Sequence, residues 1–201
     1  ENPYSPSPAL QKAITDAVAK VAADLNRYPD RDATVLRTKL ANYINELSGT
    51  KFSADNVWAA NGSNEIIQSI FLAFAQGPVL GFTPSYSMHP LIAKVTGAQW
   101  IDGKRNADFS LNTTDAIAEI QKNKPTLTFI TTPNNPTGGA VTIAEIQKLA
   151  DACKSVGGLL VVDEAYAEFS QEKSAVTLIA NNPHVIVIRT MSKAFAFAGA
   201  R

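Results

Sequence analysis

The sequence has 201 residues, with 18 lysines and arginines against 18 aspartates and glutamates, so its formal net charge is zero. A neutral chain lacks the cationic excess that neutralises phosphates, which argues against a nucleic-acid-binding protein. Hydrophobic residues make up 45% and there is one cysteine, which excludes a disordered chain, a disulfide framework and a thiolate metal cluster. No apolar run approaches the roughly 20 residues of a membrane span, and no secretion signal is visible. We therefore expect a soluble cytoplasmic protein without a membrane partner.

Predicted helices and strands alternate along the chain. Prolines at positions 3, 6 and 8 predict an extended arm over the first ten residues. Apolar residues at helical spacing predict helices over 10–25, 36–47, 66–74 and 143–153. Thr142 and Glu145 form a capping box before the last helix, and Cys153 is expected on its buried side rather than as a reactive thiol. Apolar runs predict strands over 78–82, 126–130, 159–162 and 185–188, with weaker candidates at 57–60 and 98–101.

These strands are continuously apolar rather than alternating, which is typical of parallel strands buried on both faces. Strands that alternate with helices favour a doubly wound α/β domain. In such domains ligands bind beyond the carboxyl ends of the strands. The residues that follow each predicted strand are therefore the first candidates for a functional site.

Two of these strand ends are rich in small and polar residues. After 57–60 the segment 61–65 (NGSNE) opens a helix, and exposed N–H groups at a helix start attract anions. The alternative is an ordinary N-cap by Ser63 or Asn64. After 126–131 the segment 133–139 (PNNPTGG) is either a plain polar turn or a stiff loop that holds a side-chain amide over a ligand.

The other two strand ends carry ionisable residues. Asp163 ends a buried strand and is followed by Tyr166, so its carboxylate needs a positive partner, such as a protonated ring nitrogen, or caps the next turn. Lys193 precedes a stretch of small apolar residues, where desolvation would lower its pKa and make it nucleophilic. A lysine whose amine reaches the surface is the alternative. Together the four strand ends suit a phosphorylated, carbonyl-bearing heteroaromatic ligand.

The motifs at 62–65, 84–86, 133–138, 163–166 and 189–195 together resemble the fold-type I pyridoxal-phosphate (PLP) aminotransferases. The segments 1–4, 27–30 and 192–201 make the chain most similar to the histidinol-phosphate aminotransferase subfamily. The resemblance implies a three-layer αβα large domain with a mainly parallel sheet. It also implies amino transfer between L-histidinol phosphate and 2-oxoglutarate, or imidazole-acetol phosphate and glutamate in the biosynthetic direction. This reaction belongs to histidine biosynthesis.

The resemblance also implies catalytic roles. Lys193 would hold PLP through an imine and then shuttle a proton, and Asp163 would keep the pyridine nitrogen protonated. Asn135 and Tyr166 would hydrogen-bond the phenolic oxygen of the cofactor, and Tyr86 would stack on its ring. For Tyr86 the alternative is a core aromatic residue.

For the cofactor phosphate, the resemblance assigns Ser63, Asn64, Ser192 and Arg201, with Thr190 as a weaker candidate, because hydroxyls, amides and an arginine bind phosphate oxygens. Tyr28 would reach that phosphate from a neighbouring subunit, which implies a homodimer with shared sites. His184 is expected in a surface loop. His89 is not expected to contact the cofactor; the alternative is that it approaches the substrate, because it lies three residues after Tyr86. No metal site is expected, because the sequence has no helical histidine pair or Cys/His cluster.

Members of the family are longer than this chain. We therefore expect a piece of a complete enzyme, with residues 1–27 as an N-terminal arm and helix, and 28–201 as an incomplete PLP-binding large domain that ends before the small C-terminal domain. Alternatives with the same cofactor are an aromatic amino-acid aminotransferase and a phospho-amino-acid decarboxylase. A non-catalytic nucleotide-binding domain is disfavoured, since neither a Gly-x-Gly-x-x-Gly motif nor a P-loop is present.

Overall fold

The computed structural model describes residues 2–200, and the chain divides into two compact units. Glu1–Ala59 and Met191–Arg201 form the first unit, and Ala60–Thr190 form the second. The domain boundary expected at residue 27 falls inside the first unit and stays a prediction about the complete enzyme.

The second unit is built on a five-stranded parallel sheet in the order β2-β1-β3-β4-β5. Its elements in chain order are α3 (Ser63–Phe74), β1 (Val79–Thr83), α4 (Met88–Thr96), β2 (Trp100–Lys104), α5 (Thr113–Asn123), β3 (Leu127–Thr131), α6 (Ile143–Ser155), β4 (Leu159–Asp163), two 3₁₀ helices (Ala167–Phe169 and Ala175–Asn181) and β5 (Val185–Ile188). The four strands predicted from apolar runs are confirmed. The weaker candidate at 98–101 corresponds to β2, which begins two residues later.

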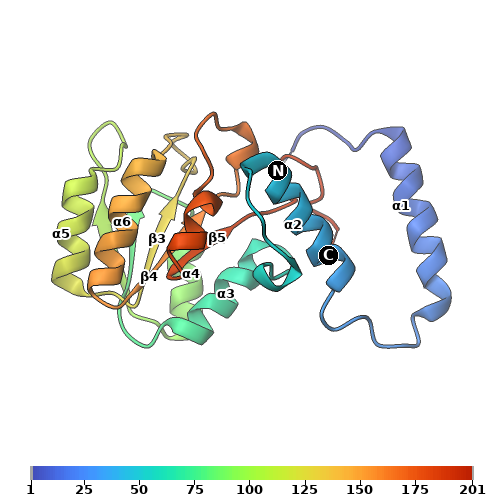
Figure 1. Ribbon diagram of the computed structural model, residues 1–201, viewed down its shortest axis with the longest axis horizontal. Helices are drawn as coiled ribbons and strands as arrows, with labels where there is room; N and C mark the ends of the chain where they lie inside the picture. The colour runs from blue at the N-terminus through green and yellow to red at the C-terminus, as the bar shows by residue number, and fades with distance from the viewer. Residues whose placement is uncertain (1, 201) are drawn as a thin grey trace. The chain divides into compact units, whose positions relative to one another are not determined.

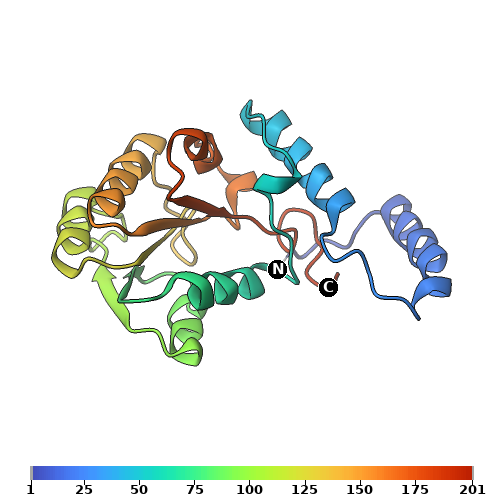
Figure 2. The ribbon, with the colours of Figure 1, turned by 60° about the horizontal axis from the view of Figure 1, so that its bottom comes forward.

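Helices cover both faces of this sheet, so the unit has three layers (Figures 1 and 2). Side chains such as Leu80 and Leu160 point to the face covered by α5 and α6, whereas Val79 and Phe129 point to the face covered by α3 and α4. Because both faces are covered, consecutive residues of β1, β3, β4 and β5 are mostly apolar, which explains the continuous runs in the sequence. The expected three-layer αβα fold is confirmed.

The helices begin where local chemistry favours it. Thr142 and Glu145 form the expected capping box at the start of α6, and Cys153 is buried on that helix, as predicted. Two helices, α4 and α5, were not predicted from the sequence. In α5 only Ala116 and Ile120 are buried, so its apolar stripe is too short to stand out from a polar segment.

The first unit contains α1 (Pro8–Val21), α2 (Thr34–Ser48) and 3₁₀ helices at Ala22–Asp24 and Ala54–Asn56. The extended arm is shorter than expected, because Ser7 caps α1 by accepting a hydrogen bond from the Leu10 amide (3.3 Å). No residue of α1 is buried, and α2 buries only Ala41. The helices predicted over 10–25 and 36–47 are confirmed as α1 with its following 3₁₀ turn and as α2. α1 leaves most of its apolar side chains exposed within this chain, and α2 leaves Val35, Leu36 and Leu47 exposed.

The weak strand candidate at 57–60 is wrong. This segment has no partner strand in the described part of the chain, and the backbone carbonyl of Val57 accepts a hydrogen bond from Arg37 Nε at 2.6 Å. The same guanidinium binds the carbonyl of Ala54. An arginine side chain therefore satisfies backbone groups that a sheet would otherwise pair.

Candidate active site

Asp163 lies at the carboxyl end of β4 and is 2% exposed. In the sheet register it stands between Thr131 of β3 and Ile188 of β5. Its Oδ1 accepts a hydrogen bond from the Ala165 amide at 3.1 Å, so one oxygen does cap the next turn. Its Oδ2 lies 3.0 Å from Nε2 of His89. The buried carboxylate therefore has a capping role and a side-chain partner at the same time.

His89 is the residue that the sequence analysis undervalued. It is 2% exposed in the first turn of α4, and its side chain contacts Asp163 directly. Its ring meets the ring of Tyr86 edge-on (centroids 5.5 Å apart, 87°) and lies 4.9 Å from the ring of Phe129. This role could not be predicted from the sequence, because His89 belongs to no motif and its partner Asp163 lies 74 positions away.

His184 was expected in a surface loop, and it precedes β5 as predicted, but it is half-buried. Its Nε2 lies 2.9 Å from the carbonyl oxygen of Ala150 on α6. That contact fixes the start of β5 against a helix, which is a structural role.

Tyr86 and Asn64 are in direct contact. The Tyr86 hydroxyl donates to Oδ1 of Asn64 at 3.1 Å, and Tyr86 also packs partly against the core on the α3–α4 face. Two residues expected around one ligand, 22 positions apart, are thus brought together. Through its edge-on contact with His89, Tyr86 also connects the start of α3 to Asp163.

The start of α3 has no side-chain cap. The N-cap is Gly62 at φ 83°, a conformation that favours glycine, so the alternative of Ser63 or Asn64 as N-cap is wrong. Glu65 instead accepts a hydrogen bond from the Asn61 amide at 2.8 Å. The first N–H groups of α3 and the half-buried Ser63 and Asn64 are consequently suited to an anion.

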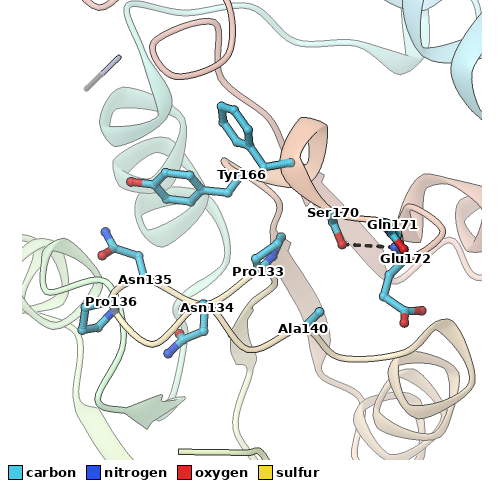
Figure 3. A pocket seen from close by; sticks show the side chains of 11 residues that line it. Pro133, Asn134, Asn135, Pro136, Ala140, Tyr166, Ser170, Gln171 and Glu172 are labelled. Carbon is cyan, nitrogen blue, oxygen red and sulfur yellow. Dashed lines mark hydrogen bonds between the residues drawn. The ribbon is translucent and has the colours of Figure 1, made fainter. Parts of the chain in front are cut away.

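A cavity of about 590 Å³ lies between the loop that follows β3 and the turn that follows β4 (Figure 3). Asn135 and Tyr166 both line it, and the Tyr166 hydroxyl points to the same side as the Asn135 amide. Asn134 is turned into the protein, where its amide donates to the carbonyl of Pro84 (3.0 Å) and accepts from Ser85 Oγ (2.9 Å). The loop at 133–139 is therefore a fixed loop rather than a plain turn.

Burial also acts on the carboxylate next to Asp163. Glu164 is 2% exposed, and desolvation raises the pKa of its carboxyl, although hydrogen bonds from Ser174 and the Ala175 amide oppose that shift. The charge is balanced by Arg189, whose Nη1 lies 3.1 Å from Glu164 Oε2.

The remaining candidates lie at the end of the second unit or in the first. Thr190 is half-buried at the end of the second unit, and Ser192 and Lys193 are half-buried in the first. The carbonyl of Lys193 accepts a hydrogen bond from the Asn2 side chain at 3.0 Å, so the N-terminal arm contacts the lysine segment. Tyr28 is fully exposed. Arg201 lies outside the described residues.

The position of Lys193 opposite Asp163 stays a prediction from the resemblance, as does the contact of Tyr28 with a neighbouring subunit. Over residues 2–200, no helix is long and apolar enough to cross a membrane. The same residues contain no group of three or more His, Cys, Asp or Glu arranged to hold a metal ion.

The sequence profile of the family "Aminotransferase class I and II" matches residues 1–201. Histidinol-phosphate aminotransferases of Mycobacterium ulcerans and Thermobifida fusca are 51% and 52% identical to the chain, and both alignments cover all of it. They cover 53% and 54% of those proteins, so the chain spans about half the length of the relatives it matches.

Solved structures agree with this relationship. The histidinol-phosphate aminotransferase of Clostridium acetobutylicum superposes with a TM-score of 0.79 at 26% identity, over the whole chain and 56% of its own length. The enzyme of Sinorhizobium meliloti, solved in complex with pyridoxal-5'-phosphate, has a TM-score of 0.81 at 24% identity, over the whole chain and 53% of its own length, and shows the same fold. The chain belongs to aminotransferase class I and II.

Proposed function

We propose that the complete protein is a PLP-dependent aminotransferase that acts on L-histidinol phosphate and 2-oxoglutarate in histidine biosynthesis. The observation that carries the proposal is the buried Asp163 at the carboxyl end of β4, whose Oδ2 lies 3.0 Å from Nε2 of His89. The choice of substrate is supported by relatives at about 50% identity that are named histidinol-phosphate aminotransferase.

The residues present suit PLP in their donor and acceptor chemistry. Asp163 offers a buried acceptor for a protonated ring nitrogen, and Asn135 and Tyr166 offer donors for a phenolic oxygen. Tyr86 offers an aromatic face, and the uncapped start of α3 offers N–H donors for a phosphate. When bound, PLP supplies an electron sink that makes the α-proton of an amino substrate acidic.

Each residue has a defined part in this reaction. Asp163 holds a proton on the ring nitrogen, and its contacts with His89 and the Ala165 amide fix the direction of its oxygens. Lys193 would hold the cofactor through its Nζ and would move a proton as general base and acid. Tyr166 and Asn135 orient the phenolic oxygen by hydrogen bonding. Ser63, Asn64, Thr190, Ser192 and Arg201 bind the phosphate.

The proposal includes a homodimer in the cytoplasm. The N-terminal helix α1 buries no residue within the described chain and leaves Leu10, Val18 and Val21 exposed, and Tyr28 is fully exposed as well. Exposed apolar side chains on one helix support an interface with another subunit. Tyr28 of each subunit would then reach the phosphate site of its neighbour.

The test uses the full-length protein with added PLP. We expect visible absorption of the bound cofactor, attachment of the cofactor to Lys193 after borohydride reduction, and glutamate-dependent turnover of imidazole-acetol phosphate. Lys193→Ala should abolish all three, whereas Lys148→Ala, which removes an exposed lysine of α6, should change none.

Three results would contradict parts of this proposal. Absence of the visible band in the intact protein would contradict the cofactor. Faster turnover of phenylalanine than of histidinol phosphate, or release of carbon dioxide from a phospho-amino acid, would contradict the substrate and favour the alternatives that share the cofactor.

A further inference from the structure

Tyr166 lies in a turn flanked by two glutamates, the buried Glu164 and the half-buried Glu168. Glu164 precedes it by two positions and is 2% exposed. Glu164 Oε1 accepts a hydrogen bond from the Ala175 amide at 2.6 Å, and its Oε2 accepts one from Ser174 Oγ at 2.6 Å. Both oxygens of this carboxylate therefore have fixed partners before any arginine is considered.

Arg189 connects the two ends of the turn. It directly follows β5, its side chain is 18% exposed, and its Nη1 lies 3.1 Å from Glu164 Oε2. Its Nη2 lies 2.6 Å from Oε1 of Glu168, two positions beyond Tyr166. One planar guanidinium thus binds carboxylates on both sides of the tyrosine, a geometry that a lysine cannot reproduce.

Backbone hydrogen bonds tighten the same turn. The Ala167 amide donates to the carbonyl of Glu164 at 3.0 Å, and the Phe169 amide donates to the carbonyl of Tyr166 at 3.0 Å. The turn is therefore short and closed, and it leads directly into the 3₁₀ helix that carries Glu168. The ion pair with Arg189 restricts the orientation of that helix.

A buried ion pair is an expensive way to stabilise a fold. Desolvation raises the pKa of Glu164, which means that its charged form is disfavoured where it lies. Apolar residues of similar volume often stabilise such a site as well or better. A network of this kind is better explained by the geometry it fixes than by the stability it contributes.

We propose that Arg189 is a positioning residue for Tyr166. By binding Glu164 and Glu168 together, it fixes the turn from which the phenol reaches the cavity beside Asn135. It thereby sets the hydrogen bond that Tyr166 gives to a ligand there. This inference rests on the proposed function, in which that ligand is the phenolic oxygen of PLP.

The test compares Arg189→Met, Tyr166→Phe and the double variant in the full-length protein loaded with PLP. The readout is the pH midpoint of the visible absorption of the bound cofactor, since a hydrogen bond to the phenolic oxygen changes that midpoint. We expect Arg189→Met to shift the midpoint in the same direction as Tyr166→Phe, by about 0.5 to 1 pH unit. The double variant should shift no further than Tyr166→Phe alone.

A second readout needs no cofactor. In the apo protein, amide hydrogen exchange over residues 164–170 should become about tenfold faster in Arg189→Met, because the ends of the turn are no longer joined. Arg189→Lys keeps the charge but loses the planar fork, so it should fall between the wild type and Arg189→Met in both readouts. It also replaces Arg189→Met if that variant does not fold.

Asn182→Ala serves as the matched control. Asn182 is also buried, and its amide binds Gln147 and the carbonyl of Leu178 rather than any residue of the Tyr166 turn. This variant should lower the thermal stability without moving the midpoint.

An unchanged midpoint in a less stable Arg189→Met protein, or unchanged exchange over 164–170, would overturn the proposal. So would additive shifts in the double variant, because Arg189 would then act independently of Tyr166. A wild-type protein without visible absorption would contradict the proposed function instead, and the exchange experiment would still decide whether Arg189 fixes the turn.

Discussion

His89 Nε2 lies 3.0 Å from Asp163 Oδ2, and both side chains are 2% exposed. The contact joins the first turn of α4 to the carboxyl end of β4. It fixes the plane of the carboxylate that we assign to the ring nitrogen of PLP. An aspartate in this position is therefore held from two sides, by a side chain and by the Ala165 amide.

His89→Leu should weaken cofactor binding and stability together. The substitution leaves Oδ2 of Asp163 without its partner, at a cost of about 1–3 kcal/mol for a buried polar group. We expect a loss of that size in the free energy of unfolding and roughly tenfold weaker PLP binding, measured by denaturant unfolding and by cofactor titration. His184→Leu, which removes the contact with the Ala150 carbonyl, is the control and should leave PLP affinity unchanged. Wild-type PLP affinity in His89→Leu would contradict this role.

The neighbouring asparagines of the 133–139 loop should respond differently to alanine. Asn134 is buried and binds Pro84, Ser85 and Thr137, so Asn134→Ala should lower the free energy of unfolding by roughly 2–3 kcal/mol. Asn135 is half-buried at the cavity, so Asn135→Ala should change stability by less than about 0.5 kcal/mol and should change the visible spectrum of bound PLP. Thermal unfolding and absorption spectra separate the two effects, and equal stability losses would disprove the assignment.

Gly81→Ala should destabilise the second unit through Trp100. A Cβ at position 81 would overlap Cη2 and Cζ2 of the Trp100 ring. Overpacking of this kind costs about 1–3 kcal/mol, which chemical denaturation would measure. Adding Trp100→Leu should recover part of the loss. Gly139→Ala, where an added Cβ has no atom within 4 Å, should be neutral. If both alanine variants unfold alike, the packing argument fails.

Cys153 should resist alkylation in the native protein. Burial raises the pKa of its thiol from 9.0 to about 11. Native protein at pH 8.5 should therefore react with iodoacetamide at Cys153 at least about 100-fold more slowly than unfolded protein, as mapped by peptide mass.

The same shift makes stability depend on pH. Between pH 9 and about 11 the unfolded thiol loses its proton whereas the folded one keeps it, so the unfolded state binds fewer protons and stability falls as pH rises. Cys153→Ala should lack this part of the fall, which is at most roughly 3 kcal/mol. A parallel pH dependence in the two proteins would contradict the raised pKa.

Much of the fold could be predicted because its signals are local. Continuous apolar runs located β1, β3, β4 and β5, since both faces of the sheet are covered. The capping box of Thr142 and Glu145 located the start of α6. The strand predicted over 57–60 was wrong although its residues favour a strand, because Arg37, 20 positions from Val57, binds the backbone of this segment.

Only those site residues that belong to recognisable sequence motifs could be predicted. Asp163, Asn135, Tyr166, Tyr86 and Asn64 were named from strand ends and resemblance, and the structure joins Tyr86 to Asn64 and places Asn135 and Tyr166 at one cavity. The partners His89 and Arg189 could not be found in this way. Each acts through contacts 21 to 74 positions away, which only the register of the sheet brings together.

The pairing of Thr131 with Asp163 and of Asp163 with Ile188 sets a limit on how this sequence can change in length. Side chains alternate between the two faces of a strand, so deleting one residue inside β4 would send the Asp163 carboxylate to the opposite layer, away from His89. A residue added to the exposed segment 106–110 would disturb no such pairing. In a library of single insertions and deletions, we expect functional survivors in that segment and none within 159–163.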